Sequence, residues 1–188
     1  MQIENVQILN GKKILLGVCS SISVYKSADL CSRLVKLGAE VVVMMTENAT
    51  KLISPRVFQT LSRNQTYVSM WVDVNTWKPE HVSLADWADM FLVAPATANT
   101  IGNFANGLAP DMMSSTFLAT AAKVLIAPAM NVNMFENPAV QANIETLRSR
   151  GVDFVEPESG MLACGIEGKG RFPEPEAIIC AMTKVFGA

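Results

Sequence analysis

The chain has 188 residues with a net charge of -2, and 50% of its residues are hydrophobic while only 17% are charged. This length fits one domain with a full core, so we expect a single domain over residues 1–188. No cluster of lysine and arginine favours nucleic acid as a partner, and no apolar stretch is long enough to cross a bilayer. We expect a cytoplasmic protein, since no signal-peptide arrangement opens the chain, and an oligomer, since the apolar fraction is high.

The cysteines and the single histidine argue against a metal site. The four cysteines, at positions 19, 31, 164 and 180, show no CxxC spacing, and only one histidine accompanies them. In a reducing compartment all four are thiols. Three of them fall in predicted strands or helices and are expected in the core, whereas Cys164 is not.

The first strand and helix are joined by a turn rich in hydroxyl groups. Residues 13–19 form a continuous apolar strand, and a helix is predicted over 24–37, where Gly38 ends it. The turn between them, Ser20-Ser21-Ile22-Ser23, combines hydroxyl groups with the free N–H groups of a helix N-terminus, which suits a phosphate-sized anion. Because the GxGxxG fingerprint is absent, a plain helix cap at Ser20 or Ser21 is the alternative.

The next segment contains a second strand and then a less regular stretch. Residues 40–45 form the strand, and Thr46 at its end lies beside the first turn if the two strands are neighbours. A helix is predicted over 54–64, followed by a short strand over 67–72. His81 follows in residues 80–88, and a lone histidine is more often a surface or core residue than a catalytic one.

The organising stretch of the chain is FLVAPATANT, residues 91–100. Its continuous apolar start indicates a strand buried on both faces of a parallel sheet, and we expect Pro95 to end the strand's hydrogen bonding. Thr97, Asn99 and Thr100 then lie at the carboxyl end of the strand, where open α/β sheets bind ligands. No charge occurs from residue 91 to 109, so neutral groups would hold the ligand; the alternative is that Thr97 or Asn99 only caps a helix.

The second half repeats this arrangement. A helix over 109–122 precedes a strand over 123–127, which again ends in a proline turn, Pro128-Ala129-Met130-Asn131. A helix over 137–150, a strand over 152–155 and a final helix over 174–186 follow. Residues 156–173 hold four of the eleven glycines and are predicted to form a long loop that acts as a lid. The alternation predicts a three-layer, doubly wound parallel sheet, a Rossmann-like or flavodoxin-like α/β fold, with both proline turns on one rim.

Several motifs resemble those of the homo-oligomeric flavin-containing cysteine decarboxylases. PATANT at 95–100 resembles the family's PASANT motif, and PAMN at 128–131 with Met134 resembles PxMNxxMW. Ala163-Cys164-Gly165, followed by Gly168, Gly170 and Arg171, resembles the ACGxxGxGR element of the coenzyme A branch. His81 falls where the family has its histidine, and the motifs occur in the family's order over nearly the whole chain.

The resemblance implies FMN as cofactor and 4'-phosphopantothenoylcysteine as substrate. In this family oxidised FMN takes two electrons from the CH–SH end, the resulting thioaldehyde allows CO2 to leave, and the enethiol is reduced to 4'-phosphopantetheine. His81 would be the base near the thiol, Asn131 would bind the departing carboxylate, and Cys164 would supply the last proton. Met161, Leu162 and Ala163 would contact the substrate from the lid. The implied FMN contacts are Ser20, Ser21, Ile22, Ser23, Thr46, Thr97, Ala98, Asn99, Thr100, Ala129 and Met130.

The resemblance also implies a trimer, or a dodecamer of trimers, with FMN near a subunit boundary. Two departures are visible: Ser20 stands where many members have glycine, and Phe135 where the peptide-modifying relatives have tryptophan. The alternatives are a peptidyl-cysteine decarboxylase, which lacks the Cys164 element, and a non-catalytic regulatory flavoprotein. Because many bacteria fuse this domain to a synthetase, a free-standing enzyme and a fragment of a fusion both remain open.

Overall fold

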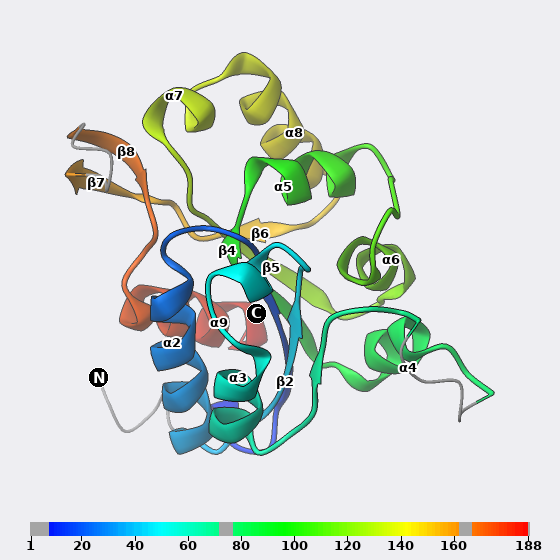
Figure 1. Cartoon of the computed structure of the whole chain (residues 1–188). Helices are drawn as coiled ribbons and strands as arrows, with labels where there is room; N and C mark the ends of the chain where they lie inside the picture. Colours follow the sequence, from blue (N-terminus) through cyan, green and yellow to red (C-terminus); the bar gives the residue numbers. More distant parts are fainter. Residues whose placement is uncertain (1–7, 72–76, 162–166, 188) are drawn as a thin grey trace.

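A parallel sheet forms the centre of the molecule (Figure 1). The computed structural model describes residues 8–71, 77–161 and 167–187. The six strands lie in the order β3-β2-β1-β4-β5-β6, and every neighbouring pair is parallel. The first strand, β1, lies in the middle of the sheet. The chain adds β2 and β3 on one side of it and β4, β5 and β6 on the other, so the strand order switches between β1 and β4, where such sheets bind ligands. The strands are β1 (Lys13–Val18), β2 (Glu40–Met45), β3 (Thr66–Tyr67), β4 (Met90–Ala96), β5 (Lys123–Pro128) and β6 (Asp153–Phe154).

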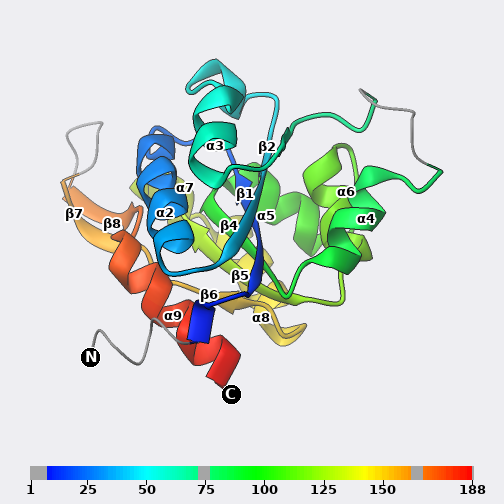
Figure 2. The same ribbon diagram turned by 90° about the horizontal axis from the view of Figure 1, so that it is seen from below.

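Helices cover both faces of the sheet, as the doubly wound prediction requires (Figure 2). Alternate strand residues point to opposite faces, so Ile14 and Leu16 join one core and Leu15 joins the other, each fully buried. The first face is covered by α2 (Val24–Lys36), α3 (Pro55–Ser62) and α9 (Pro175–Gly187). The second face is covered by α4 (Glu80–Trp87), α5 (Ala98–Ala105), α6 (Met112–Ala119) and α8 (Pro138–Ser149). Two short helices follow strands of the sheet: η1 (Ala49–Lys51) comes after β2, and α7 (Val132–Phe135) comes after β5.

Local signals place the helix starts. Ser54 and Asn137 each accept a backbone N–H with the side chain and are followed by a proline in the first turn, which confirms the predicted starts of α3 and α8. Asp111 and Ser114 form a reciprocal capping box at the start of α6. No helix in the described part of the chain is long and apolar enough to span a membrane.

Two strand predictions need correction. The short strand expected over 67–72 is limited to β3 among the described residues, since Thr66 and Tyr67 alone of them pair with β2 here, and residue 72 lies outside the described residues. The chain then leaves the sheet and lines a cavity described below. Pro95 does not end β4: the register shifts after Val93, and pairing resumes between Ala96 and Pro128. Proline removes one donor, but the strand continues past it.

The expected loop over 156–173 is also wrong in part, because its described residues form an antiparallel hairpin. Strands β7 (Glu158–Met161) and β8 (Glu167–Arg171) pair from Glu158 opposite Arg171 to Met161 opposite Glu167. Two of the glycines that suggested a loop, Gly168 and Gly170, mark close packing instead. A Cβ atom at Gly168 would lie 2.3 Å from Cγ2 of Val132, so only glycine lets β8 approach α7 this closely.

Candidate active site

The polar turns converge at the carboxyl edge of the sheet, where backbone hydrogen bonds join them. The amide of Cys19, just after β1, donates to the carbonyl of Pro95 at 3.1 Å. The amide of Ala129 donates to the carbonyl of Ala96 at 3.0 Å. The two proline turns and the first turn therefore form one rim, as the sequence predicted for the proline turns.

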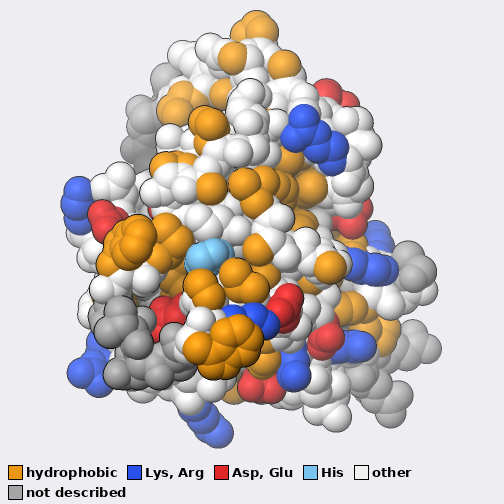
Figure 3. All heavy atoms as spheres, turned by 90° about the vertical axis from the view of Figure 1, so that its right-hand side faces the viewer, with side chains coloured by type: hydrophobic (Ala, Val, Ile, Leu, Met, Phe, Trp, Pro, Cys, Tyr) orange, Lys and Arg blue, Asp and Glu red, His pale blue; other side chains and the backbone are white. Residues whose placement is uncertain are grey.

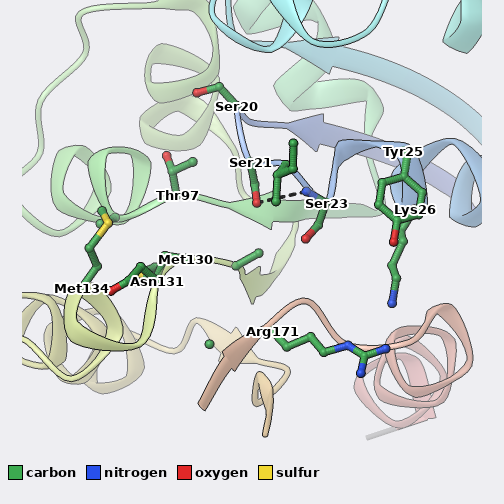
Figure 4. A pocket seen from close by; sticks show the side chains of 14 residues that line it. Ser20, Ser21, Ser23, Tyr25, Lys26, Thr97, Met130, Asn131, Met134 and Arg171 are labelled. Atoms are coloured by element: carbon green, nitrogen blue, oxygen red, sulfur yellow. Dashed lines mark hydrogen bonds between the residues drawn. The ribbon is translucent and has the colours of Figure 1, made fainter. Parts of the chain in front are cut away.

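A cavity of about 670 Å³ opens at this rim (Figure 4). It lies between the first turn, the two proline turns, α2 and β8. Its lining comprises Ser20, Ser21, Ile22, Ser23, Tyr25, Lys26, Thr97, Ala98, Ala129, Met130, Asn131, Met134, Gly170 and Arg171.

A second cavity of about 600 Å³ adjoins the first, and Ser20, Thr97, Ala98 and Met134 line both. Of the predicted cofactor residues, Thr46, Asn99 and Thr100 lie here. The amide of Thr46 donates to the carbonyl of Val18 at 3.0 Å, which holds the end of β2 beside the first turn. All eleven predicted cofactor contacts thus line one or both cavities.

The N-terminus of α2 faces the first cavity without a side-chain cap. Its N-cap residue, Ser23, makes no capping hydrogen bond with its hydroxyl group, unlike the caps of α3, α5, α6 and α8. The Ser21 hydroxyl oxygen accepts from the Ser23 amide at 3.4 Å, which is a weak contact. A 13-residue helix carries partial positive charge at this end, so the turn suits an anion better than it serves as a plain cap.

Thr97 serves as a cap and also lines both cavities. Its hydroxyl oxygen accepts from the Thr100 amide at 3.4 Å, as the simpler interpretation of the sequence proposed. The Thr100 hydroxyl group in turn lies 3.2 Å from the Cys19 sulfur, beneath the rim. Burial of that thiol raises its pKa to about 11, so Cys19 is a protonated structural group at neutral pH.

Asn131 is positioned by the start of α7. Its Oδ1 accepts from the Asn133 amide at 2.9 Å, which fixes the plane of the side-chain amide. Asn131, Met130 and Met134 lie together on one side of the cavity (Figure 4). This arrangement presents a neutral N–H donor group rather than a cation on that side of the cavity.

His81 lies elsewhere. It is on α4, partly buried, and it is not among the described residues that line either cavity. Helices α2 and α4 are on opposite sides of the sheet (Figure 2), and the histidine is visible among hydrophobic side chains on its own face (Figure 3). Met161 ends β7, and Leu162, Ala163 and Cys164 lie outside the described residues. The proposed roles of these five residues stay predictions.

Several lining residues were not assigned to the site from the sequence. Tyr25 and Lys26 lie in the first turn of α2, and Arg171, noted before only as part of a motif, ends β8. The helical position of the first two was available from the sequence, because they directly follow the hydroxyl turn. Among the described residues, no group of histidine, cysteine and acidic side chains has the arrangement of a metal site.

Comparison with known proteins identifies the family. A family model described as Flavoprotein matches residues 2–187 of the chain. The chain belongs to the flavoprotein family. The Coenzyme A biosynthesis bifunctional protein CoaBC of Bacillus subtilis is 50% identical over 179 residues, which is 95% of this flavoprotein and 44% of the relative. The chain thus spans less than half the length of that relative.

Two further relatives are similar over nearly their whole length. A probable phosphopantothenoylcysteine decarboxylase of Streptococcus mutans is 43% identical over 170 residues, covering 89% of this flavoprotein and 95% of that protein. The crystal structure of SpaF, an FMN-dependent cysteine decarboxylase, is 30% identical with a TM-score of 0.78. The match covers 94% of this chain and 99% of SpaF.

The two cavities fit a flavin cofactor chemically. The first offers hydroxyl groups and an uncapped helix N-terminus to a phosphate group. The second adds Thr46, Asn99 and Asn103, which are neutral donors and acceptors suited to a polyol chain and ring carbonyls. Methionine side chains in both cavities provide the apolar surface that a planar ring needs.

Proposed function

We propose that this flavoprotein is an FMN-dependent phosphopantothenoylcysteine decarboxylase of coenzyme A biosynthesis. It would release CO2 from 4'-phosphopantothenoylcysteine and form 4'-phosphopantetheine. The observation that carries the proposal is that Asn131 and the hydroxyl-rich turn, Ser20 to Ser23, line the same cavity. The Streptococcus mutans relative, which the chain matches over 95% of its length, supports the choice of substrate. A cytoplasmic location stays a prediction.

Different residues of the cavity would bind the cofactor and the substrate. The first turn, Ser21 to Ser23, would hold the FMN phosphate at the start of α2, while Thr97 and Ala129 would contact the rest of the cofactor. When bound, FMN would supply a two-electron oxidation of the CH–SH group and return the electrons at the end. The Asn131 amide would donate to the substrate carboxylate without neutralising it. A neutral donor holds this group while still allowing it to leave as CO2, whereas a cation would stabilise the carboxylate.

We further propose that a neighbouring copy of the chain completes the site. Asn131 lines the first cavity, whereas His81 lies on α4 and is not among the described residues that line either cavity. We therefore propose that the base and the carboxylate site come from different chains. Hydrophobic side chains around the histidine provide a surface suited to a subunit contact (Figure 3). A homotrimer, or a dodecamer built from trimers, would bring His81 of one copy to the cavity of the next.

The product of one reaction tests this function. The purified holoenzyme is incubated without oxygen with 4'-phosphopantothenoylcysteine, and the product mass is measured beside a Cys164→Ser variant. We expect 4'-phosphopantetheine from the natural chain and accumulated enethiol, two mass units lighter, from the variant. A peptide ending in cysteine is tested in parallel, because a peptidyl-cysteine decarboxylase is the alternative and SpaF, an FMN-dependent cysteine decarboxylase, is similar in structure. If only the peptide is turned over, the protein is a peptidyl-cysteine decarboxylase. If flavin is bound but neither compound is turned over, a regulatory flavoprotein is favoured.

A further inference from the structure

The charges of the two adjoining cavities differ. Among the described residues that line the first cavity, only Lys26 and Arg171 carry a charge, and both are cations. The second cavity is lined by two acidic residues, Glu47 and Asp111, and by no cation among its described residues. An anionic ligand group is therefore attracted to the first cavity and repelled from the second.

One carboxylate holds the two cations next to each other. The Lys26 Nζ lies 2.6 Å from Oε1 of Glu174, and Arg171 Nη2 lies 3.1 Å from the same oxygen. The hydrogen bond from Lys26 lowers the pKa of the Glu174 carboxyl below its usual value, and the positive charge of Lys26 lowers it further. Glu158 lies beside this group as well, since its Oε1 accepts from the Glu174 amide at 3.1 Å. Neither glutamate lines the cavity.

The shared oxygen offers fewer acceptor sites than the two cations have N–H donors. The Lys26 side chain is 15% exposed and that of Arg171 is 43% exposed, so both groups still reach solvent at the cavity wall. A phosphomonoester dianion has three acceptor oxygens of the kind that an arginine and a lysine bind together.

The pair lies across the cavity from the predicted carboxylate site. Figure 4 shows Lys26 and Arg171 on one side and Asn131 with Met134 on the other, with Ser21 and Ser23 between them. A ligand with a carboxylate at one end and a phosphate group at the other can contact both sides. The proposed substrate has this form, since its cysteine and its phosphate group are at opposite ends.

We propose that Lys26 and Arg171 bind the phosphomonoester end of the substrate, while the first turn of α2 binds the cofactor's phosphate. This inference rests on the proposed function and assigns the direction in which the substrate lies in the cavity. It also makes the pair a specificity determinant, because a dephosphorylated analogue or a neutral peptide gains nothing from the two cations.

Binding of an unreactive analogue tests the pair. 4'-Phosphopantothenate and pantothenate both lack the cysteine, so their Kd values for the FMN-loaded protein can be measured by calorimetry without turnover. We expect the natural chain to prefer the phosphorylated compound, and Lys26→Gln or Arg171→Gln to weaken only that compound, by about tenfold each. The preference should fall at high salt, because both groups are accessible to solvent ions.

Matched variants control for the loss of a surface charge. Arg33 lies on α2 and pairs with Glu176, and Lys169 lies on β8 and pairs with Glu156. Neither lines a cavity. Arg33→Gln and Lys169→Gln remove the same charge from the same two elements and should leave both Kd values unchanged.

Glu174→Gln separates ligand binding from a purely structural ion pair. If the pair binds phosphate, removing the competing carboxylate should tighten binding of 4'-phosphopantothenate several-fold. If the three residues only fasten β8 to α2, Glu174→Gln should weaken binding, as the two cation variants do, and the proposal would be overturned.

The remaining outcomes also decide between the proposals. If both cation variants keep the preference for the phosphorylated analogue, the proposal is overturned. It is also overturned if the variants lose FMN and not that preference, because the two cations would then bind the cofactor. Phosphate-dependent binding that Arg171→Gln abolishes supports it even where the product assay shows no decarboxylation. Conversely, normal decarboxylation with unchanged preference rejects this inference alone and leaves the proposed function standing.

Discussion

The backbone amide of Met130 donates to the carbonyl oxygen of Gly170 at 3.1 Å, which joins the second proline turn directly to β8. A Cβ atom at Gly170 would lie only 2.4 Å from the Met130 carbonyl oxygen, and the φ of Gly170 is +149°. Only glycine allows both the conformation and the approach. The base of the hairpin and the turn that presents Asn131 therefore form one unit.

Gly170→Ala should separate this unit. The added methyl group meets a backbone oxygen that cannot rotate away, so we expect a loss of roughly 2–4 kcal/mol of unfolding free energy. Turnover should fall further than stability accounts for, because the Asn131 turn shifts. Chemical denaturation and kinetics on the same samples measure both. Gly151→Ala is the control: that residue has φ +86° and no atom within 4 Å of an added Cβ, so it should cost only about 1 kcal/mol and no activity.

Asn131→Asp should abolish decarboxylation while the fold is retained. Aspartate is a good N-cap, so α7 should still begin at the same residue. The negative charge, however, repels the substrate carboxylate. Flavin absorbance and thermal unfolding should match those of the natural chain, while CO2 release disappears. Decarboxylation at the natural rate in this variant would remove the assigned role.

His81→Asn should keep flavin and lose oxidation of the substrate thiol. His81 lines neither cavity, so cofactor binding has no direct dependence on it. If a neighbouring copy supplies this residue, coexpressed His81→Asn and Asn131→Asp chains should regain turnover in mixed oligomers. Differently tagged chains allow those oligomers to be purified. Mixed oligomers that stay inactive would argue against a shared site, and a fully active His81→Asn variant would make the histidine dispensable.

Cys19 predicts a stability change at alkaline pH. Its pKa is raised from 9.0 to about 11 because burial disfavours the thiolate, so the folded state holds this proton more tightly than the unfolded state does. The contribution is fully present below pH 9 and is lost as the pH rises toward about 11. Denaturant titrations from pH 8 to 11 should therefore show a smaller loss of stability for Cys19→Ala than for the natural chain. Equal slopes would show that the thiol does not titrate in this way.

The sequence predicted the fold well because its signals are local. The second strand begins and ends at the predicted residues, Glu40 and Met45, since continuous apolar character and a flanking glycine act over short distances. The hairpin was missed because Gly168 and Gly170 resemble loop residues until the turn that they contact is known. A glycine selected for close packing and one selected for a turn look the same in a sequence.

The candidate site was predictable only in part, because some of its residues have local signals and others are brought together only by the fold. The two proline turns were found because each follows a strand, and parallel strands end at one edge. Lys26 was not predicted, and Arg171 was noted only as the end of the ACGxxGxGR resemblance. Their common role was not predictable, because 145 positions separate them and an ion pair through Glu174 has no sequence pattern. Thr97 caps α5, as one interpretation of the sequence held, and it also lines both cavities, so its predicted contact with a ligand stays compatible with the cap.

The rim is assembled from the ends of β1, β2, β4 and β5, which lie far apart along the chain. None of these segments can form the site before the central sheet is complete. Flavin therefore binds only the finished fold and shifts the folding equilibrium toward it by mass action. The absorbance of bound flavin should accordingly report complete folding, and riboflavin supply during expression should govern the yield of native protein.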